Sequence, residues 1–169
     1  MNITMIGMPS SGKSTVGVLL AKRLGMSFID IDIVIQERTG RLLKEIISEQ
    51  GREGFLKVEG DTAASLSPEN AVLAPGGSIC YEDWAMEHLK RISTVVYLKI
   101  SYKEMEARIG NVTDRGVAIP EGYTLRDLYN ERTALYEKYA DITVDEEGLT
   151  LGDTVDILRR KMTERFSRK

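Results

Sequence analysis

Residues 7–15 read GMPSSGKST and carry the most specific chemical pattern in the sequence, G-x-x-x-x-G-K-[ST]. Glycines in such a loop let successive backbone N–H groups point at one phosphate. The lysine then lies along the β- and γ-phosphates, and the hydroxyl beside it can enter the shell of a Mg²⁺ ion. The pattern predicts a loop that binds a nucleoside triphosphate through Gly7, Pro9, Ser10, Ser11, Gly12, Lys13, Ser14 and Thr15. Lys13 is expected to be an exposed loop cation that takes part directly in catalysis.

The segments around this pattern supply the strand and the helix that it needs. Residues 3–6 form a short apolar run before the loop, and apolar residues recur after it with helical spacing. Gly25 is placed to end that helix. The positive end of the helix dipole then lies at the phosphates. Because motif and context agree, we prefer a phosphate-binding loop to a chance glycine–serine turn.

Two carboxylates follow the second apolar run, residues 27–30. Asp30 and Asp32 are two residues apart, so on an extended segment they point to the same side. We predict that Asp30 holds Mg²⁺ through water and that Asp32 reaches the hydroxyl of an acceptor, accepting its proton or fixing its orientation. The structural alternative makes Asp32 the N-cap of the next helix and Asp30 a turn residue.

Apolar runs that alternate with helical patterns predict an α/β fold, a parallel sheet with helices on both faces. The predicted strands are residues 3–6, 27–30, 71–74, 94–100 and 142–144, and the predicted helices are 13–24, 32–38, 42–50, 55–66, 81–91, 101–108, 124–139 and 151–166. Ligands of such sheets bind beyond the carboxyl ends of the strands. The helical insertion at about residues 32–66 is where a small-molecule kinase usually places its acceptor site.

Two further segments follow strands and invite a functional interpretation. The third strand runs into Pro75-Gly76-Gly77-Ser78, where glycines permit close approach of backbone to ligand; the alternative is a plain turn. Residues 109–123 form a long polar segment, typical of a lid that closes over a triphosphate; the alternative is a solvated loop. Arg115 lies in this segment and Arg108 at its entrance. Arg132 lies in a later helical pattern, where a solvated arginine is the ordinary expectation.

The composition describes an ordinary globular protein and excludes several classes. The chain has 169 residues, which suggests one domain, with 29% charged and 42% apolar residues. The net charge of -3 argues against a broad nucleic-acid or anionic-membrane surface. The first residues form a strand and not a signal peptide, and Cys80 is the single cysteine, so we expect a cytoplasmic protein. We also expect a monomer.

Over nearly the whole chain these motifs resemble the shikimate kinase family. The segment GMPSSGKST is similar to the nucleotide motif of that family, FIDIDIVIQERTG to its FxDxDxxIE segment, and LYNERTALYEKYAD to its late helix. The resemblance implies the P-loop NTPase fold of the nucleoside-monophosphate-kinase type, a five-stranded parallel sheet of order 2-3-1-4-5 with a lid and a helical substrate-binding region. It implies ATP and Mg²⁺ as cofactors and a small hydroxy acid as acceptor.

The resemblance also assigns roles to individual residues. It implies Asp30 near Mg²⁺ and Asp32 on the acceptor hydroxyl, with the PGGS segment as the substrate-binding glycine run. Arg108 and Arg115 match the lid arginines, one beside the adenine and one near the transferred phosphate. Arg132 takes the role of the arginine that grips the substrate carboxylate.

Two positions depart from the family pattern, and both fall at the acceptor site. The FRxxE segment of the family is here Phe55 to Glu59, so Leu56 stands where an arginine is expected, and Ser78 replaces a third glycine. Lys57 is adjacent but points about 100° away on a helix. Leucine cannot form the bidentate contact to a carboxylate that arginine forms.

Three hypotheses remain open from the sequence. The first is a kinase that phosphorylates a hydroxyl of shikimate. The second is a related kinase with another acceptor, such as homoserine or another hydroxy acid. The third is a non-catalytic nucleotide-binding module, which Lys13, Ser14, Asp30, Asp32 and Arg115 disfavour because a mere binder has no use for an acceptor-side carboxylate.

Overall fold

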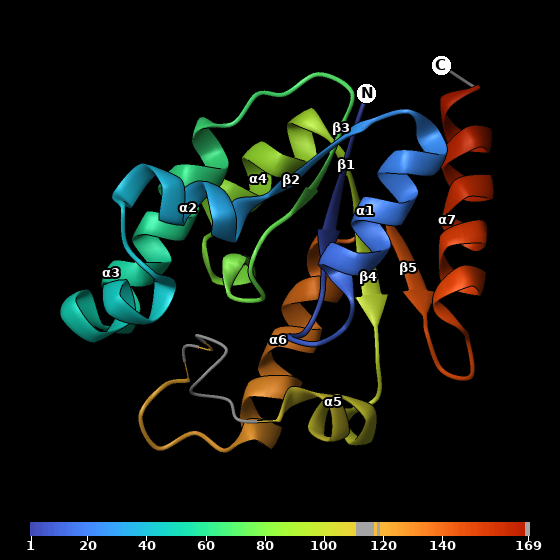
Figure 1. Ribbon diagram of the computed structural model, residues 1–169. Helices are drawn as coiled ribbons and strands as arrows, with labels where there is room; N and C mark the ends of the chain where they lie inside the picture. The colour runs from blue at the N-terminus through green and yellow to red at the C-terminus, as the bar shows by residue number, and fades with distance from the viewer. Residues whose placement is uncertain (111–116, 118, 168–169) are drawn as a thin grey trace.

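The computed structural model describes residues 1–110, 117 and 119–167, which form a five-stranded parallel sheet flanked by helices (Figure 1). The strand order is β2-β3-β1-β4-β5. The strands are β1 (Asn2–Ile6), β2 (Ser27–Asp30), β3 (Ala71–Ala74), β4 (Thr94–Lys99) and β5 (Ile142–Asp145). In the central register, Ile3 lies between Val72 and Thr94. The predicted α/β class, the order 2-3-1-4-5 and all five predicted strands are confirmed.

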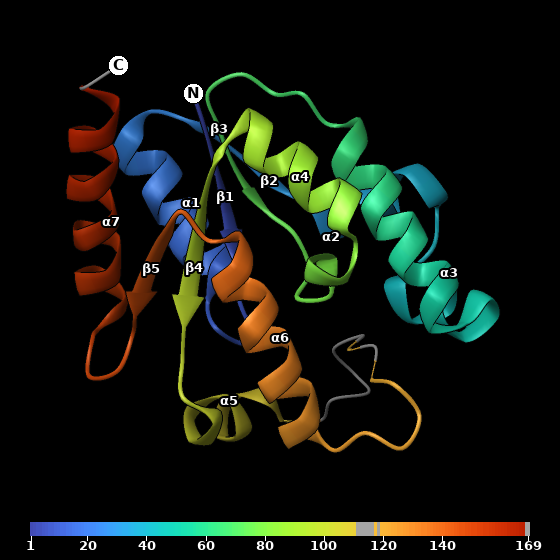
Figure 2. The ribbon, with the colours of Figure 1, turned by 180° about the vertical axis from the view of Figure 1, so that it is seen from behind.

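The sheet separates two apolar cores, one on each face. Helices α1 (Lys13–Leu24) and α7 (Leu151–Phe166) cover one face, which Figure 1 shows in front. Helices α4 (Asp83–Ile92) and α6 (Leu125–Tyr139) cover the other face, seen in Figure 2. Every residue of β1 and of β3 is buried. This double burial explains why the strands are mostly apolar and why β3, with the sequence AVLA, shows no alternation of polar and apolar residues.

Local sequence signals set the ends of most helices. Gly25 takes φ 66° and ends α1, as predicted. The hydroxyl of Ser101 accepts a hydrogen bond from the Glu104 N–H and caps α5 (Tyr102–Ile109). Thr124 and Thr150 begin α6 and α7 with capping boxes. These caps fix the directions in which the helices leave the ligand-binding edge of the sheet.

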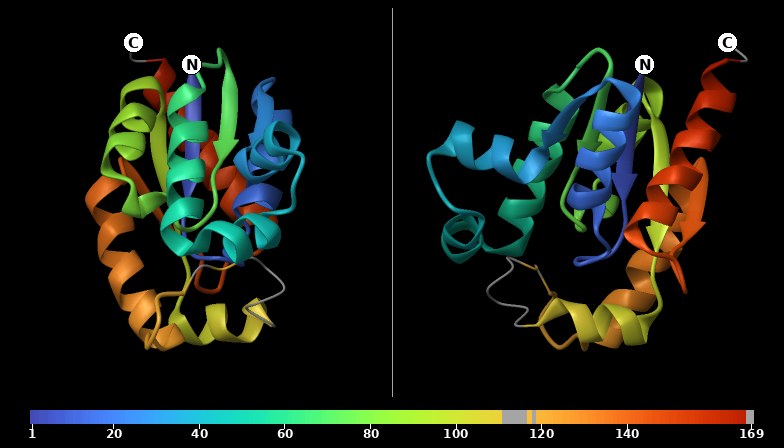
Figure 3. Two further views of the ribbon diagram at one scale, coloured as in Figure 1. Left: turned by 90° about the vertical axis from the view of Figure 1, so that its left-hand side faces the viewer. Right: turned by 45° about the vertical axis from the view of Figure 1, so that its right-hand side comes forward.

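The region between β2 and β3 is helical, as predicted, and the break within its second helix is shorter than predicted. It holds α2 (Ile31–Thr39) and α3 (Leu43–Ser65), which stand beside the sheet as Figure 3 shows. We predicted helices at 42–50 and 55–66, and α3 does consist of two helical stretches, which meet at Gly51 with φ 69° and ψ -177°. Glycine takes this conformation without steric cost, so one residue separates the two stretches.

The carboxyl ends of the strands share one edge of the sheet with the P-loop and with α5 (Figure 1). The 3₁₀ helix η1 (Ile79–Tyr81) also lies at this edge and precedes α4, for which we predicted a start at residue 81. In the described part of the chain, none of the helices combines the length and the apolar character that crossing a membrane requires.

Candidate functional site

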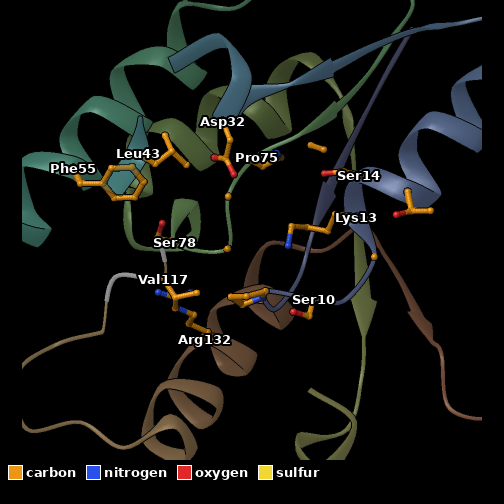
Figure 4. Close-up of a pocket in the computed structure, with 16 residues that line it drawn as sticks. Ser10, Lys13, Ser14, Asp32, Leu43, Phe55, Pro75, Ser78, Val117 and Arg132 are labelled. Atoms are coloured by element: carbon orange, nitrogen blue, oxygen red, sulfur yellow. The ribbon is translucent and has the colours of Figure 1, made fainter. Parts of the chain in front are cut away.

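A cavity of about 350 Å³ lies at the carboxyl edge of the sheet, at the position that parallel sheets use for ligands (Figure 4). The P-loop forms one wall, and residues from α2, α3, α6 and the segment after β3 form the other. Among the described residues, the lining consists of Pro9, Ser10, Gly12, Lys13, Ser14, Thr15, Asp32, Leu43, Phe55, Ala74, Pro75, Gly76, Gly77, Ser78, Val117 and Arg132. The cavity therefore joins the predicted phosphate site to the predicted acceptor site.

The P-loop backbone needs residues that tolerate positive φ. Gly12 takes φ 86° as the N-cap of α1, and Ser10 takes φ 66°. Gly7 has φ 150°, and a Cβ there would lie 2.7 Å from the carbonyl oxygen of Leu98. The buried Ser11 hydroxyl has no hydrogen-bond partner. Gly7 and Ser11 therefore shape the loop from behind, since neither lines the cavity.

Lys13 is buried, with only 9% of its surface exposed, so the expectation of an exposed cation is wrong. Its Nζ donates hydrogen bonds to the carbonyl oxygens of Gly7 (2.9 Å) and Met8 (3.0 Å). Burial lowers the pKa of Lys13 to about 8, and the negative charge of Asp32 opposes this shift. The loop closes on the lysine because its carbonyl groups are nearby acceptors, and the ammonium still faces the cavity (Figure 4).

Ser14 and Asp30 form a pair of oxygen ligands beside the P-loop. The Ser14 hydroxyl donates to Asp30 Oδ2 over 2.9 Å. Asp30 Oδ1 accepts from the backbone N–H of Asp32, so Asp30 is the N-cap of α2. The capping role that we considered for Asp32 therefore belongs to Asp30. In the described residues no cluster of three or more His, Cys, Asp or Glu could enclose a metal, so this pair fits an ion that keeps water and phosphate ligands, as Mg²⁺ does.

Asp32 lies in the first turn of α2 and directs its carboxylate into the cavity (Figure 4). Its Oδ1 is buried and has no hydrogen-bond partner among the described residues. Burial, and then the charge of Asp30, raises the pKa of Asp32 to about 6. A carboxylate with this pKa is ionised at neutral pH and still basic enough to take a proton from an acceptor.

The glycine run after β3 brings backbone and carboxylates into close contact. A Cβ on Gly76 would lie 2.3 Å from Glu59 Oε1 and 3.1 Å from Asp32 Oδ1. A Cβ on Gly77 would lie 3.1 Å from the Pro9 side chain and 3.2 Å from a guanidinium nitrogen of Arg132. A side chain at Gly76 would force a neighbour to shift, and one at Gly77 would be tighter than ordinary packing, which a plain turn would not produce.

Glu59 lies behind Gly76 and does not line the cavity. It is fully buried, and its Oε2 accepts a 2.5 Å hydrogen bond from the Ser78 hydroxyl. Burial, and then the charge of Asp32, raises the pKa of Glu59 to about 7. Ser78, the residue that departs from the family glycine, thus holds a buried acid in place.

Arg132 is 1% exposed and lines the cavity, so the solvated arginine that the helix pattern alone suggested is wrong (Figure 4). Its Nε donates to the hydroxyl of Tyr81 over 3.4 Å. The sequence did hold a signal for this burial. Leu128 and Tyr136, four residues before and after it, are fully buried and place Arg132 on the inward face of α6.

The remaining predicted site residues are not brought to the cavity or cannot be placed. Leu56 is 5% exposed and does not belong to the lining. Arg108 lies on α5, forms an ion pair with Glu104, and is also absent from the lining. Arg115 and much of the predicted lid, residues 109–123, lie outside the described residues; Val117 is described and lines the cavity.

Sequence reasoning missed two aromatic or cationic residues near the acceptor wall. Two arginines contact the ring of Tyr81. The guanidinium carbon of Arg52 lies 4.6 Å from the centroid of the ring, and that of Arg132 lies 5.3 Å from it. Tyr81 was counted only as a helix residue, and Arg52 fell in a predicted break between helices. No pattern of residue spacing in the sequence indicates the contact between Arg52 and Tyr81. A kink in α3 and the short η1 helix bring the two residues together.

Comparison with known proteins indicates the same kind of site as the geometry of the cavity does. The sequence model of the family described as shikimate kinase matches residues 9–163. A shikimate kinase of Thermodesulfovibrio yellowstonii is 36% identical over 88% of this chain and 87% of its own length. One of Mycobacterium avium is 41% identical over 83% of this chain and 81% of its own length.

A solved structure leads to the same family. The shikimate kinase from Acinetobacter baumannii, in complex with shikimate, superimposes with a TM-score of 0.85 and 30% identity, covering 99% of this chain and 94% of that chain. Family model, sequence identity and structural likeness all extend over most of the residues that build the cavity. The chain therefore belongs to the shikimate kinase family.

Proposed function

We propose that this chain transfers the γ-phosphoryl group of ATP to a hydroxyl group of shikimate. One observation supports this function most strongly: the Asp32 carboxylate and the Arg132 guanidinium approach one cavity from opposite sides, next to the P-loop (Figure 4). A small hydroxy acid can place its hydroxyl at Asp32 and its carboxylate at Arg132. The relatives from Thermodesulfovibrio yellowstonii and Mycobacterium avium, which match this chain over most of its length, are shikimate kinases.

The proposed reaction breaks the bond between the γ-phosphorus and the β–γ bridging oxygen and forms a bond to the acceptor oxygen. Asp32 orients the acceptor hydroxyl and takes its proton, for which its pKa of about 6 is suited. Lys13 exchanges its hydrogen bonds to the loop carbonyl groups for contacts to the β- and γ-phosphates. Arg115 stabilises the charge on the transferred group, as we predict from its place in the lid segment.

Ser14 and Asp30 are the residues that would hold Mg²⁺, since their oxygens lie 2.9 Å apart beside the phosphate loop. When bound, the ion neutralises phosphate charge during transfer. Arg132 fixes the acceptor through its carboxylate, which a guanidinium can grip with two parallel hydrogen bonds. We also propose that the enzyme is monomeric and cytoplasmic.

The test is an ADP-release assay on purified protein with ATP, Mg²⁺ and one acceptor at a time. We expect rapid ADP release with shikimate and only background release with homoserine, with other hydroxy acids, or without acceptor. The matched control is Asp32→Asn, which keeps the cavity shape and should lose the acceptor-dependent signal. Faster release with homoserine than with shikimate would replace the proposed acceptor, and acceptor-independent release would contradict a kinase.

A further inference from the structure

We propose that Arg52 is a second cation of the acceptor site and binds, together with Arg132, the carboxylate of the acceptor. This inference rests on the proposed function, because it concerns the same site. It assigns the carboxylate to a pair of guanidinium groups held on one tyrosine ring. The pair is built from residues of α3, η1 and α6 that lie far apart in the sequence.

The first argument is the shared platform. The guanidinium carbons of Arg52 and Arg132 lie 4.6 Å and 5.3 Å from the centroid of the Tyr81 ring. Arg132 also donates to the Tyr81 hydroxyl. An aromatic face attracts a guanidinium and limits its freedom, so Tyr81 preorganises both groups. Arg132 lines the cavity and Arg52 does not, so the link between Arg52 and the acceptor wall is the Tyr81 ring that both guanidinium groups contact.

The second argument is the shortage of partners for Arg52. In the described part of the chain, Arg52 forms no ion pair, and its buried Nε has no hydrogen-bond acceptor. Other arginines in the same structure do pair with carboxylates, for example Arg23 with Asp156 and Arg41 with Glu49. A buried guanidinium N–H without an acceptor is costly, so a bound anion that accepts from it is stabilised.

The third argument is electrostatic. Two guanidinium groups on one ring repel each other, and an anion between them turns that repulsion into attraction. The carboxylates of Asp32 and Glu59 lie beside Gly76 and not at Tyr81, in the contacts that the structure gives. The acceptor hydroxyl and the acceptor carboxylate therefore have separate partners, which orients a hydroxy acid in one direction.

The kink in α3 explains how Arg52 reaches this place. Gly51 leaves the helical conformation, and Arg52 opens the next turn. Leu56, four residues later, lies on the same face of the helix and is buried. Lys57 points to solvent, with 74% of its side chain exposed, and forms an ion pair with Asp61. Arg52, and not Lys57, is therefore the cation that lies on the same helix face as Leu56.

The experiment compares Arg52→Gln with Lys57→Gln, a matched control on the same helix. We expect Arg52→Gln to raise the KM for shikimate roughly tenfold or more, with the KM for ATP and the melting temperature nearly unchanged. Lys57→Gln should leave both KM values unchanged. Arg52→Lys should recover part of the loss, because a lysine keeps the charge but not the planar pair of donors.

A second readout separates carboxylate binding from a structural role. The carboxamide analogue of shikimate lacks the negative charge, so wild type and Arg52→Gln should use it with similar KM values. An Arg52→Gln enzyme with the wild-type KM for shikimate, or with equal losses on both acceptors, would overturn the inference. Those outcomes presuppose an active wild type, whereas a wild type that phosphorylates none of the acceptors would contradict the proposed function itself.

Discussion

Ser78 donates a 2.5 Å hydrogen bond to Oε2 of Glu59, and both side chains are buried behind the glycine run. The other carboxylate oxygen of Glu59, Oε1, lies against Gly76 and has no hydrogen-bond partner in the part of the chain that the structure describes. Burial disfavours the charged form of the Glu59 carboxyl group. The protonation of this residue at the acceptor wall therefore affects the stability of the fold.

The Glu59 pair predicts a pH-dependent stability. Burial raises the folded-state pKa of Glu59 from 4.5 to about 7, so the folded protein holds this proton more tightly than the unfolded chain. The contribution to the free energy of unfolding is therefore full below about pH 4.5 and is lost as pH rises through 7, by up to roughly 3 kcal/mol. Glu59→Gln should be more stable than wild type at pH 8 and gain little at pH 5. Urea denaturation at both pH values measures this, and a gain independent of pH would contradict it.

Gly76 should not tolerate a side chain. In Gly76→Ala the new methyl group meets Glu59 Oε1 at 2.3 Å and Asp32 Oδ1 at 3.1 Å, so both carboxylates must move. We expect a loss of about 1–3 kcal/mol in stability and a raised KM for the acceptor. Gly152→Ala in α7 is the control, since its nearest neighbour lies at 3.7 Å, and it should be neutral or slightly stabilising. Equal melting temperatures for wild type and Gly76→Ala would refute the packing argument.

Lys13→Ala should abolish phosphoryl transfer while the protein stays folded. The ammonium faces the phosphate wall of the cavity, and charge stabilisation carries most of the catalysis of this reaction. We expect turnover to fall on the order of a thousandfold or more. Lys22→Ala, an exposed lysine on the same helix, should keep wild-type turnover. Turnover assays on both variants give the comparison, and substantial activity in Lys13→Ala would remove the role assigned to the P-loop.

The Asp32→Asn variant tests whether Asp32 acts on the acceptor hydroxyl or belongs to the Mg²⁺ site. The variant should lose most turnover and bind ATP almost as wild type does, because Asp30 and Ser14, not Asp32, form the oxygen pair beside the phosphates. Wild-type turnover should also fall as pH drops through about 6, where Asp32 becomes protonated. Titration of ATP and a pH profile of turnover measure both effects. A collapse of ATP affinity in Asp32→Asn would exchange the roles of Asp30 and Asp32.

The sequence determined the fold closely because its signals are local. Continuous apolar runs, Gly25 at a helix end and the caps Ser101, Thr124 and Thr150 each act within a few residues. A break after residue 50 was predicted, and only its length was not, because glycine permits a one-residue kink as readily as a longer interruption.

The site was predictable where the residues adjoin one motif, as in the P-loop and Asp30. The site was not predictable where the role of a residue depends on whether tertiary packing buries its side chain. Lys13 looked exposed and Arg132 looked solvated, yet tertiary packing buries both. The contact of Arg52 with Tyr81 depends on two irregular backbone segments, so no periodicity announces it.

The most direct test follows the phosphoryl group itself. Purified protein is incubated with ATP labelled in its γ-phosphate, Mg²⁺ and shikimate, and the label is traced by chromatography and by ³¹P NMR. We predict that the label appears on a hydroxyl of shikimate in wild type and in Lys22→Ala, and that it stays on ATP in Lys13→Ala and Asp32→Asn. Label released as inorganic phosphate, or equal labelling of shikimate by the Asp32→Asn protein, would contradict the account.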